Sequence, residues 1–194
     1  MKIFSFFIKR LGDVFFSGLG LILLIPIFLI IGLIIKLSMP GPIFFLQERV
    51  GKNKKNFKII KFRTMKLDKE AESKIDTSKD LERTTRFGKI MRRTKIDELP
   101  QLFNVIKGDM SLVGPRPTIK RQVDKYNEYE AKRLIMKPGM TGLSQVNGGT
   151  ALPWKERIEL DIKYVENFTV LLDIKIFLKT IGVIIFGEDK YKKN

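Results

Sequence analysis

Residues 14–35, "VFFSGLGLILLIPIFLIIGLII", are 22 consecutive residues without a charged side chain, and the architecture of the whole chain follows from them. As a helix, a run of this length can cross a hydrocarbon core about 30 Å thick. It is too long for the apolar part of a signal peptide, and no small-residue cleavage site follows it. We therefore expect a retained membrane segment. The alternative is a buried helix of a soluble domain.

Pro26 divides this run into parts of 12 and 9 residues. A proline inside a helix removes a backbone hydrogen bond and kinks or breaks the helix. Both flanks of the run are basic, and the positive-inside rule then assigns both to the cytoplasmic side. These two features predict a re-entrant helix that enters one leaflet, bends at Pro26 and returns. A straight single pass with a tolerated proline is the alternative.

The composition limits the chemistry. The chain has 194 residues, about one domain in length, and contains neither cysteine nor histidine. Disulfides, thiolate or imidazole metal sites and histidine-based triads are therefore excluded. Lysine and arginine number 37 against 21 acidic residues, giving a formal charge of +16. A field of this sign favours a polyanionic partner: nucleic acid, an anionic lipid surface or a phosphorylated substrate.

The remaining pattern predicts a mainly helical α+β fold. The runs at 40–50 and 57–65 are rich in Ile and Phe, and Gly and Asn residues separate them, which indicates a β-hairpin. Residues 66–82 are polar and are expected to form a loop. Apolar residues recur at helical spacing within 84–95 and again from Leu99 to Gly108.

The C-terminal half is expected to contain three helices and one loop. Residues 119–137 and 153–168 have the pattern of polar helices, whereas 137–149 hold four glycines and a proline and predict a loop. Residues 169–187 suit a helix at the membrane interface or one packed on the core. The expected organisation is a membrane helix at 1–38, a cytosolic domain with interfacial amphipathic helices at 39–187, and a charged tail at 188–194.

Asp97 and Glu98 lie next to each other at the predicted start of a helix, with Pro100 in its first turn. Adjacent acids in such a place are commonly capping residues. Here, however, they follow a stretch from Arg83 to Ile96 that has six basic residues and no acid. An ionised carboxylate in such surroundings can ligate Mg²⁺ or attack phosphorus.

Further basic residues surround this pair in the sequence. Arg116 stands between two prolines, which restrict the backbone and suit a bidentate grip on phosphate, although a surface arginine in a tight turn is the alternative. Lys61 and Arg63 alternate with apolar residues, so a strand would direct both to one face. Solvation of a strand surface explains that alternation equally well.

Four motifs, in this order, resemble the bacterial sugar transferase family, the monotopic phosphoglycosyl transferases. The resemblance covers roughly residues 6–180. The motifs are "KRLGDVFFSGLGLILLIPIFLIIGLIIKL" (9–37), "GPIFFLQERVGKNKKNFKIIKFRTM" (41–65), "DELPQLFNVIKGDMSLVGPRP" (97–117) and "KPGMTGLSQVNG" (137–148).

The resemblance implies an enzyme that transfers a sugar phosphate from a UDP-sugar to undecaprenyl phosphate and releases UMP. It implies Asp97 as the nucleophile that forms a covalent phosphosugar and helps to hold Mg²⁺, with Glu98 positioning it or handling protons. The residues expected to bind substrate are Lys61, Arg63, Arg92, Arg116 and Gln145. The implied location is the cytoplasmic face of a bacterial inner membrane, with no nucleic-acid partner.

Three positions depart from the family pattern: Ile25 stands where serine is common, Leu143 where tryptophan is common, and Gly149 where relatives often carry arginine. The last two leave the donor sugar unassigned. A membrane-anchored basic module would explain the anchor and the charge. It would not explain the acidic pair and the proline-flanked arginine, nor would a structural subunit with an inactive site.

Overall fold

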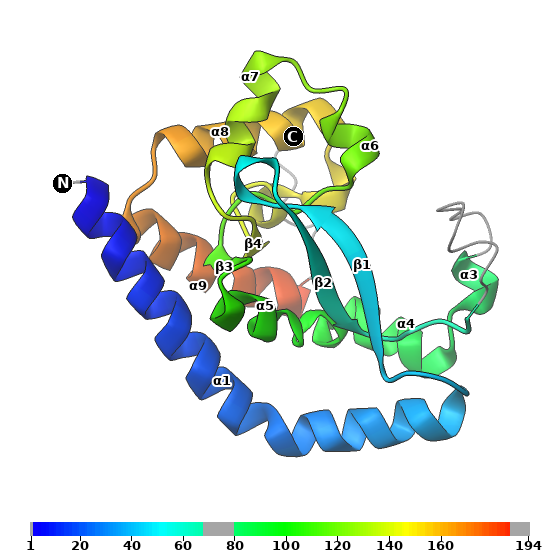
Figure 1. Cartoon of the computed structure of the whole chain (residues 1–194). Helices are drawn as coiled ribbons and strands as arrows, with labels where there is room; N and C mark the ends of the chain where they lie inside the picture. Colours follow the sequence, from blue (N-terminus) through cyan, green and yellow to red (C-terminus); the bar gives the residue numbers. More distant parts are fainter. Residues whose placement is uncertain (1, 68–79, 187–194) are drawn as a thin grey trace.

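The computed structural model describes residues 2–67 and 80–186. Most of the loop expected at 66–82, and the whole tail expected at 188–194, lie outside these residues. The described part is mainly helical, with one long apolar helix at the N-terminus and two small two-stranded sheets (Figure 1). This agrees with the predicted mainly helical α+β class.

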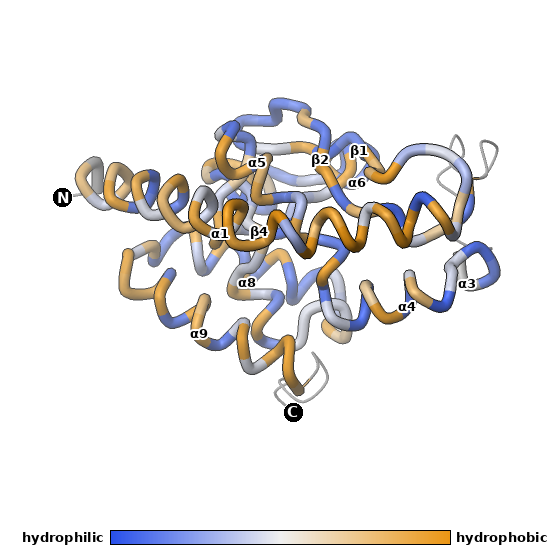
Figure 2. Tube along the Cα trace, turned by 90° about the horizontal axis from the view of Figure 1, so that it is seen from below, coloured by the Kyte–Doolittle hydropathy of each residue, from blue (hydrophilic) through white to orange (hydrophobic). Residues whose placement is uncertain are grey.

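Helix α1, Lys2–Ser38, is 37 residues long and contains Pro26. It runs along one side of the molecule and changes direction partway (Figure 1). It is the one described helix long and apolar enough to cross a membrane, yet only 17% of its most apolar window is buried. A core helix of a soluble protein would bury most of that surface. Figure 2 shows these apolar residues along α1 on the face seen from below, with α9 on the same side of the molecule.

Charged residues in the first half of α1 bond to the rest of the chain. The Lys9 ammonium donates to Asp173 Oδ2 at 2.6 Å and to the carbonyl of Val113 at 2.7 Å. The Asp13 carboxylate accepts from the hydroxyl of Ser111 and from the backbone N–H of Leu112, at 3.0 and 2.9 Å. The polar side chains of α1 therefore attach it to the domain while its apolar side chains stay exposed.

The predicted hairpin is confirmed. Strand β1, Phe44–Val50, pairs antiparallel with β2, Asn56–Phe62, with Phe44 opposite Phe62 and Val50 opposite Asn56. The 3-10 turn η1, Lys52–Lys54, connects them, and the Gly51 N–H closes the connection on the carbonyl of Lys55 at 2.8 Å. This hairpin brings Lys61 and Arg49 into the molecule from the two strands.

The predicted helix at 84–95 is α4, Arg86–Arg93, preceded by the short helix α3, Asp80–Arg83. Thr85 caps α4 by accepting from the backbone N–H of Gly88. A Cβ on Gly88 would lie 2.1 Å from the carbonyl oxygen of Thr64, so only glycine allows α4 to pack this closely on the end of the hairpin.

Two expectations for the middle of the chain are wrong. Residues 119–137 do not form one helix but α6 (Lys120–Val123), α7 (Glu128–Ala131) and the 3-10 turn η3 (Lys132–Ile135). The break occurs because Asn127 and Glu130 form a capping box that starts a new helix. The glycine-rich segment contains strand β4, Gly139–Thr141, which pairs in parallel with β3, Ser111–Val113. A Cβ on Gly139 would lie 2.1 Å from the Gly114 nitrogen, so the glycine permits this pairing.

The C-terminal part contains the two remaining helices, as predicted. After the 3-10 turns η4 (Gln145–Asn147) and η5 (Gly149–Ala151) follow α8, Trp154–Glu166, and α9, Val170–Phe186. Ile176 and Val183 of α9 enter a buried cluster with Tyr164 of α8 and Val113 of β3. The other face of α9 carries exposed Leu and Ile side chains, so α9 both packs on the core and presents an apolar face.

We predict that Lys9→Met lowers the free energy of unfolding by about 3–5 kcal/mol. The reason is that it leaves the Asp173 carboxylate buried without its ammonium partner. The matched control is Lys120→Met, which removes an ion pair with side chains 70% and 55% exposed and should change stability by less than about 0.5 kcal/mol. Denaturation of the detergent-solubilised proteins measures both. Equal losses of stability in the two variants would contradict the conclusion that the Lys9–Asp173 ion pair stabilises the fold.

Candidate active site

Asp97 and Glu98 lie in a 3-10 turn, η2, Ile96–Glu98, which directly precedes the helix at whose N-terminus the sequence places them. Helix α5, Gln101–Lys107, begins three residues after Glu98, with Pro100 as its N-cap residue. The turn forms because Lys95 adopts a left-handed conformation with φ of 59°, which ends the preceding helical segment. The tight turn directs the two carboxylates into different surroundings.

Asp97 is almost completely buried, with 7% of its surface exposed. Burial, and after it the charge of Glu98, raises the pKa of Asp97 above its ordinary value. This direction is opposite to the one that the neighbouring basic residues alone would produce. Three cations act in the opposite direction but are outweighed: Lys61, Arg92 and Lys95. The Asp97 Oδ1 atom has no hydrogen-bond partner within residues 2–67 and 80–186.

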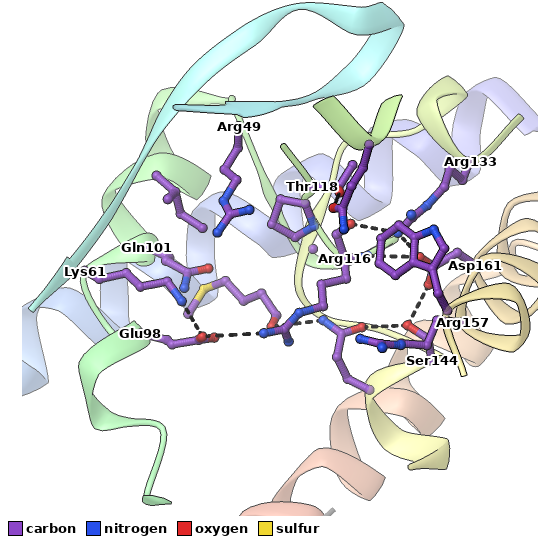
Figure 3. Close-up of a pocket in the computed structure, with 17 residues that line it drawn as sticks. Arg49, Lys61, Glu98, Gln101, Arg116, Thr118, Arg133, Ser144, Arg157 and Asp161 are labelled. Carbon is purple, nitrogen blue, oxygen red and sulfur yellow. Dashed lines mark hydrogen bonds and ion pairs between the residues drawn. The ribbon is translucent and has the colours of Figure 1, made fainter. Parts of the chain in front are cut away.

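Glu98 is held as an anion. Its Oε1 accepts from the Lys61 ammonium at 2.6 Å and lies 4.0 Å from Arg116 Nη2. Burial alone would raise the pKa of Glu98, but Lys61 and Arg116 together lower it to about 2. Figure 3 shows these two cations reaching Glu98 from opposite sides. Adjacent residues in the chain therefore have pKa values displaced in opposite directions.

A polar cavity opens beside Glu98 between the hairpin, the turn at Arg116 and helix α8 (Figure 3). The described charged residues that line it are mostly cationic, five basic side chains against two carboxylates: Arg49, Lys61, Arg116, Arg133, Arg157, Glu98 and Asp161. Arginine side chains in this number match an anion with several phosphate oxygens. Asp97 is not among the described residues that line the cavity; it lies directly before Glu98 in the same turn.

Asp161 and Arg133 fix the backbone of Arg116. The Asp161 Oδ2 atom accepts from the Arg116 N–H at 3.3 Å, and the Arg133 guanidinium donates to the Arg116 carbonyl at 2.9 Å. Asp161 and Arg133 also form an ion pair with side chains 1% and 2% exposed. The Ser144 hydroxyl completes the group by donating to Asp161 Oδ1 at 2.7 Å. This buried cluster holds Arg116 where it faces Glu98.

The structure brings together most of the residues expected to bind substrate. Lys61, Arg116 and Gln145 line the cavity. Arg92 acts on Asp97 electrostatically and donates to the Thr64 hydroxyl at 2.9 Å.

Arg63 is placed elsewhere: its buried guanidinium donates to the carbonyls of Met39 and Pro40, both at 2.8 Å. Arg63 therefore stabilises the end of α1, and its assignment as a substrate-binding residue is not supported by these contacts.

Sequence reasoning missed Asp161, Arg133, Arg49 and Arg157. A signal for Asp161 was present, because it falls on the same helical face as Trp154, Ile158 and Val165. A charged residue on an otherwise apolar face indicates a buried partner. Arg49 resembles any other basic residue flanking the membrane segment, so its position in the cavity depends on the pairing of the hairpin.

The residues near Asp97 fit a divalent cation that is bound jointly with a substrate. The unpartnered, buried Asp97 Oδ1 is a suitable oxygen ligand. Among the described residues, no group of three or more acidic side chains is placed to enclose a metal ion. Mg²⁺ commonly takes one or two carboxylates together with substrate phosphates and water, so the absence of such a group does not disagree with this ion.

We predict opposite stability changes for the two carboxylates at neutral pH. Because the folded-state pKa of Asp97 is raised, its ionisation above that pKa costs stability, and Asp97→Asn should raise the midpoint of thermal denaturation. Because the folded-state pKa of Glu98 is about 2, the pair it forms contributes above about pH 4.5. Glu98→Gln should therefore lower the free energy of unfolding, by up to about 3 kcal/mol.

The pH profile of thermal denaturation checks the sign of these two stability changes. The difference between Glu98→Gln and the native chain should shrink as the pH falls below 4.5 toward 2. A lower midpoint for Asp97→Asn at pH 7 would contradict the raised pKa of Asp97.

We predict that Asp161→Asn lowers the free energy of unfolding by about 3–5 kcal/mol, because it leaves the Arg133 guanidinium buried without a counter-charge. Glu166→Gln, on the same helix, is the control: it removes a pair with Lys132 whose side chains are half-exposed and should change stability by less than about 1 kcal/mol. Denaturant titration in detergent compares the two variants, and similar losses would argue against the role of the buried pair.

Comparison with known proteins places the chain in a family. Residues 4–187 match the family described as bacterial sugar transferase. The chain is 42% identical over 161 residues to an uncharacterized sugar transferase, EpsL, of Bacillus subtilis, a match that covers 83% of this chain and 79% of the relative.

Two further relatives carry more specific names. One is the UDP-N-acetylgalactosamine-undecaprenyl-phosphate N-acetylgalactosaminephosphotransferase of Aeromonas hydrophila, 42% identical over 93% of this chain. The other is the UDP-glucose:undecaprenyl-phosphate glucose-1-phosphate transferase of Klebsiella pneumoniae, 39% identical over 89% of this chain. The matches span 44% and 39% of the length of these two relatives. The chain belongs to the bacterial sugar transferase family and is an enzyme of the phosphoglycosyl transferase type.

Proposed function

We propose that the protein transfers a sugar phosphate from a UDP-sugar to undecaprenyl phosphate, giving undecaprenyl diphosphate sugar and UMP. The observation that carries this proposal is the pair of adjacent carboxylates beside a cationic cavity. Glu98 lines the cavity and is held by Lys61 and Arg116, and the buried Asp97 directly before it has an unpartnered oxygen. The names of the two undecaprenyl-phosphate transferases support the choice of donor and acceptor.

In the first step an Asp97 carboxylate oxygen attacks the phosphorus that carries the sugar. The new Asp97 O–P bond forms as the bond from that phosphorus to the UMP oxygen breaks, and UMP leaves with the electron pair. An anion that attacks an anionic phosphate must overcome repulsion, which positive groups around the phosphate reduce. The arginines that line the cavity would supply this positive charge. Since Asp97 is 7% exposed, substrate binding must also open its approach.

Glu98 acts by position and charge in this proposal. A carboxyl group with a pKa of about 2 carries no proton at neutral pH, so it is a poor proton donor. Its contacts with Lys61 and Arg116 instead orient two cations toward the reacting phosphate. Of the two roles expected for Glu98, we therefore favour positioning over proton handling.

We propose Mg²⁺ as the cofactor, held by Asp97 with the donor's phosphates. The ion would supply positive charge that stabilises the leaving UMP and favours the ionised form of Asp97. That contribution would offset the burial that raises the pKa of this carboxyl group.

In the second step an oxygen of undecaprenyl phosphate attacks the phosphorus of the Asp97 phosphosugar. The Asp97 O–P bond breaks, the carboxylate is restored, and the product is a diphosphate that joins lipid and sugar. No proton transfer is required, because the attacking phosphate oxygen and the leaving carboxylate are both anions. One site therefore serves both substrates in turn.

We further propose that α1 is re-entrant, with its bend at Pro26, and that the site faces the cytoplasmic leaflet of the inner membrane. The basic flanks of the apolar run, the exposure of its side chains and the change in direction of α1 support this topology (Figure 1). The exposed apolar face of α9 suits the membrane interface beside it (Figure 2). The formal charge of +16 favours an anionic leaflet.

We predict that the purified protein in detergent with Mg²⁺ and undecaprenyl phosphate releases UMP from one or a few UDP-sugars. The two named relatives act on different sugars, so a panel of donors is needed. Asp97→Asn should lower the rate by at least about 10³-fold, because an amide cannot form the phosphosugar bond. Chelation of Mg²⁺ should also abolish release.

Denatured native protein, after incubation with donor alone, should carry the mass of one sugar phosphate on the peptide that contains Asp97. Glu166→Gln serves as the folding control, because it retains the nucleophile and the lining of the cavity and should carry the same added mass. Equal UMP release by Asp97→Asn and the native chain would overturn the assignment of the nucleophile.

A further inference from the structure

A second, apolar groove lies against the polar cavity, between the start of α5 and helix α9. It has a volume of about 250 Å³. Leu99 and Leu102 line it on the α5 side, and Phe177, Val183 and Ile184 line it on the α9 side. This groove is distinct in character from the arginine-lined cavity described above.

The groove and the cavity meet at the active site. Glu98, Arg116 and Gln145 line both of them. Lys95 also lines the groove and contributes to the positive field at Asp97. A ligand in the groove would therefore have an anionic group at the Glu98–Arg116 end and an apolar body along the remainder.

Away from Glu98, the groove is lined by residues of the exposed apolar face of α9, which we propose lies at the membrane interface. Phe177 and Ile184 are 47% and 46% exposed and belong to the apolar face of α9. On the opposite wall, Leu102 lies beside α1: a Cβ on Gly20, within the uncharged run, would be 3.4 Å from Leu102 Cδ1. The groove thus connects apolar surface of α9 and the neighbourhood of α1 with Glu98, the residue that directly follows the proposed nucleophile.

We propose that this groove holds the first isoprene units of the lipid phosphate acceptor and thereby places its phosphate against the Asp97 phosphosugar. The proposal rests on the function proposed above. A volume of about 250 Å³ is below the ~300–1,000 Å³ of sites that enclose a drug-sized ligand, so most of the long chain remains in the bilayer.

The groove contributes mainly by packing and orientation. Lipid tails are as apolar as the groove walls, so moving a chain from bilayer to groove gains little hydrophobic free energy. Close packing fixes the direction of the chain, and with it the distance between the acceptor oxygen and the phosphorus. A polar side chain in the wall would face the isoprenoid without a hydrogen-bond partner and weaken binding.

The test compares Phe177→Asn with Leu178→Asn. Both change an exposed apolar residue of α9 to the same polar one, but Phe177 lines the groove, and the described groove-lining residues do not include Leu178. KM for undecaprenyl phosphate is measured in mixed micelles, together with UMP release from donor without acceptor. We expect Phe177→Asn to raise this KM about tenfold more than Leu178→Asn, with the donor half-reaction equal in the two variants.

The outcomes separate the inference from the proposed function. Equal KM values in the two variants, with the donor half-reaction intact, would overturn the groove assignment and leave the proposed function standing. No UMP release by the native protein from any donor would overturn the proposed function and the groove assignment with it.

A photoreactive polyprenyl phosphate provides a readout that does not depend on activity. Crosslinks in the native protein should map to residues 99–102 and 170–186, and undecaprenyl phosphate should compete for them whereas phosphatidylglycerol should not. Equal competition by phosphatidylglycerol would identify a general lipid-binding groove and overturn the proposal, as would crosslinks confined to α1.

Discussion

The structure depends on the way in which the charged side chains of α1 are satisfied. An apolar helix that carries Lys9, Arg10 and Asp13 cannot leave these groups in hydrocarbon without partners. Each of them bonds to the domain: Lys9 to Asp173 of α9, Asp13 to the residues of β3, and Arg10 to the carbonyls of Val105 and Ile106 at the end of α5. Helix α1 and the domain are thereby joined by polar contacts, while the exposed surface of the helix remains apolar.

The two acidic residues show how burial and charge pairing distribute roles between chemically similar groups. Lys61 and Arg116 lower the pKa of Glu98 and keep it anionic. Asp97, one residue earlier, is buried and is repelled by the charge of Glu98, and both effects raise its pKa. A buried carboxylate with an unpartnered oxygen is costly for folding. Such a cost is expected where the group is needed for chemistry and not for stability.

Much of the fold could be predicted from sequence because local patterns determine it. The apolar run, the hairpin of residues 40–65, the helix within 84–95 and the helix within 153–168 were all predicted from such patterns. The prediction of a single helix through 119–137 failed because Asn127 starts a new helix. The hydrogen bond from the backbone to the Asn127 side chain competes with continuation of the helix, and the spacing of apolar residues does not reveal this competition. The pairing of β3 with β4 depends on contacts between segments far apart in sequence, so the glycines alone suggested only a loop.

The same division applies to the site. Asp97, Glu98, Lys61, Arg116 and Gln145 were identified from motifs, and the structure brings them together. Arg63 was not distinguishable from Lys61, because alternation in a strand gives the direction of a side chain but not what it meets. The raised pKa of Asp97 was also beyond prediction, since burial is a property of the assembled fold.

The contact between Arg10 and the C-terminal carbonyls of α5 has a consequence for how the enzyme would meet its acceptor. α5 follows the turn that holds Asp97 and Glu98, so this guanidinium helps to fix the position of that turn relative to α1. Under the proposed function, encounters with the acceptor then occur by lateral diffusion within one leaflet. Turnover would follow the mole fraction of acceptor in the bilayer surface, and dilution with inert lipid would slow it at constant bulk concentration.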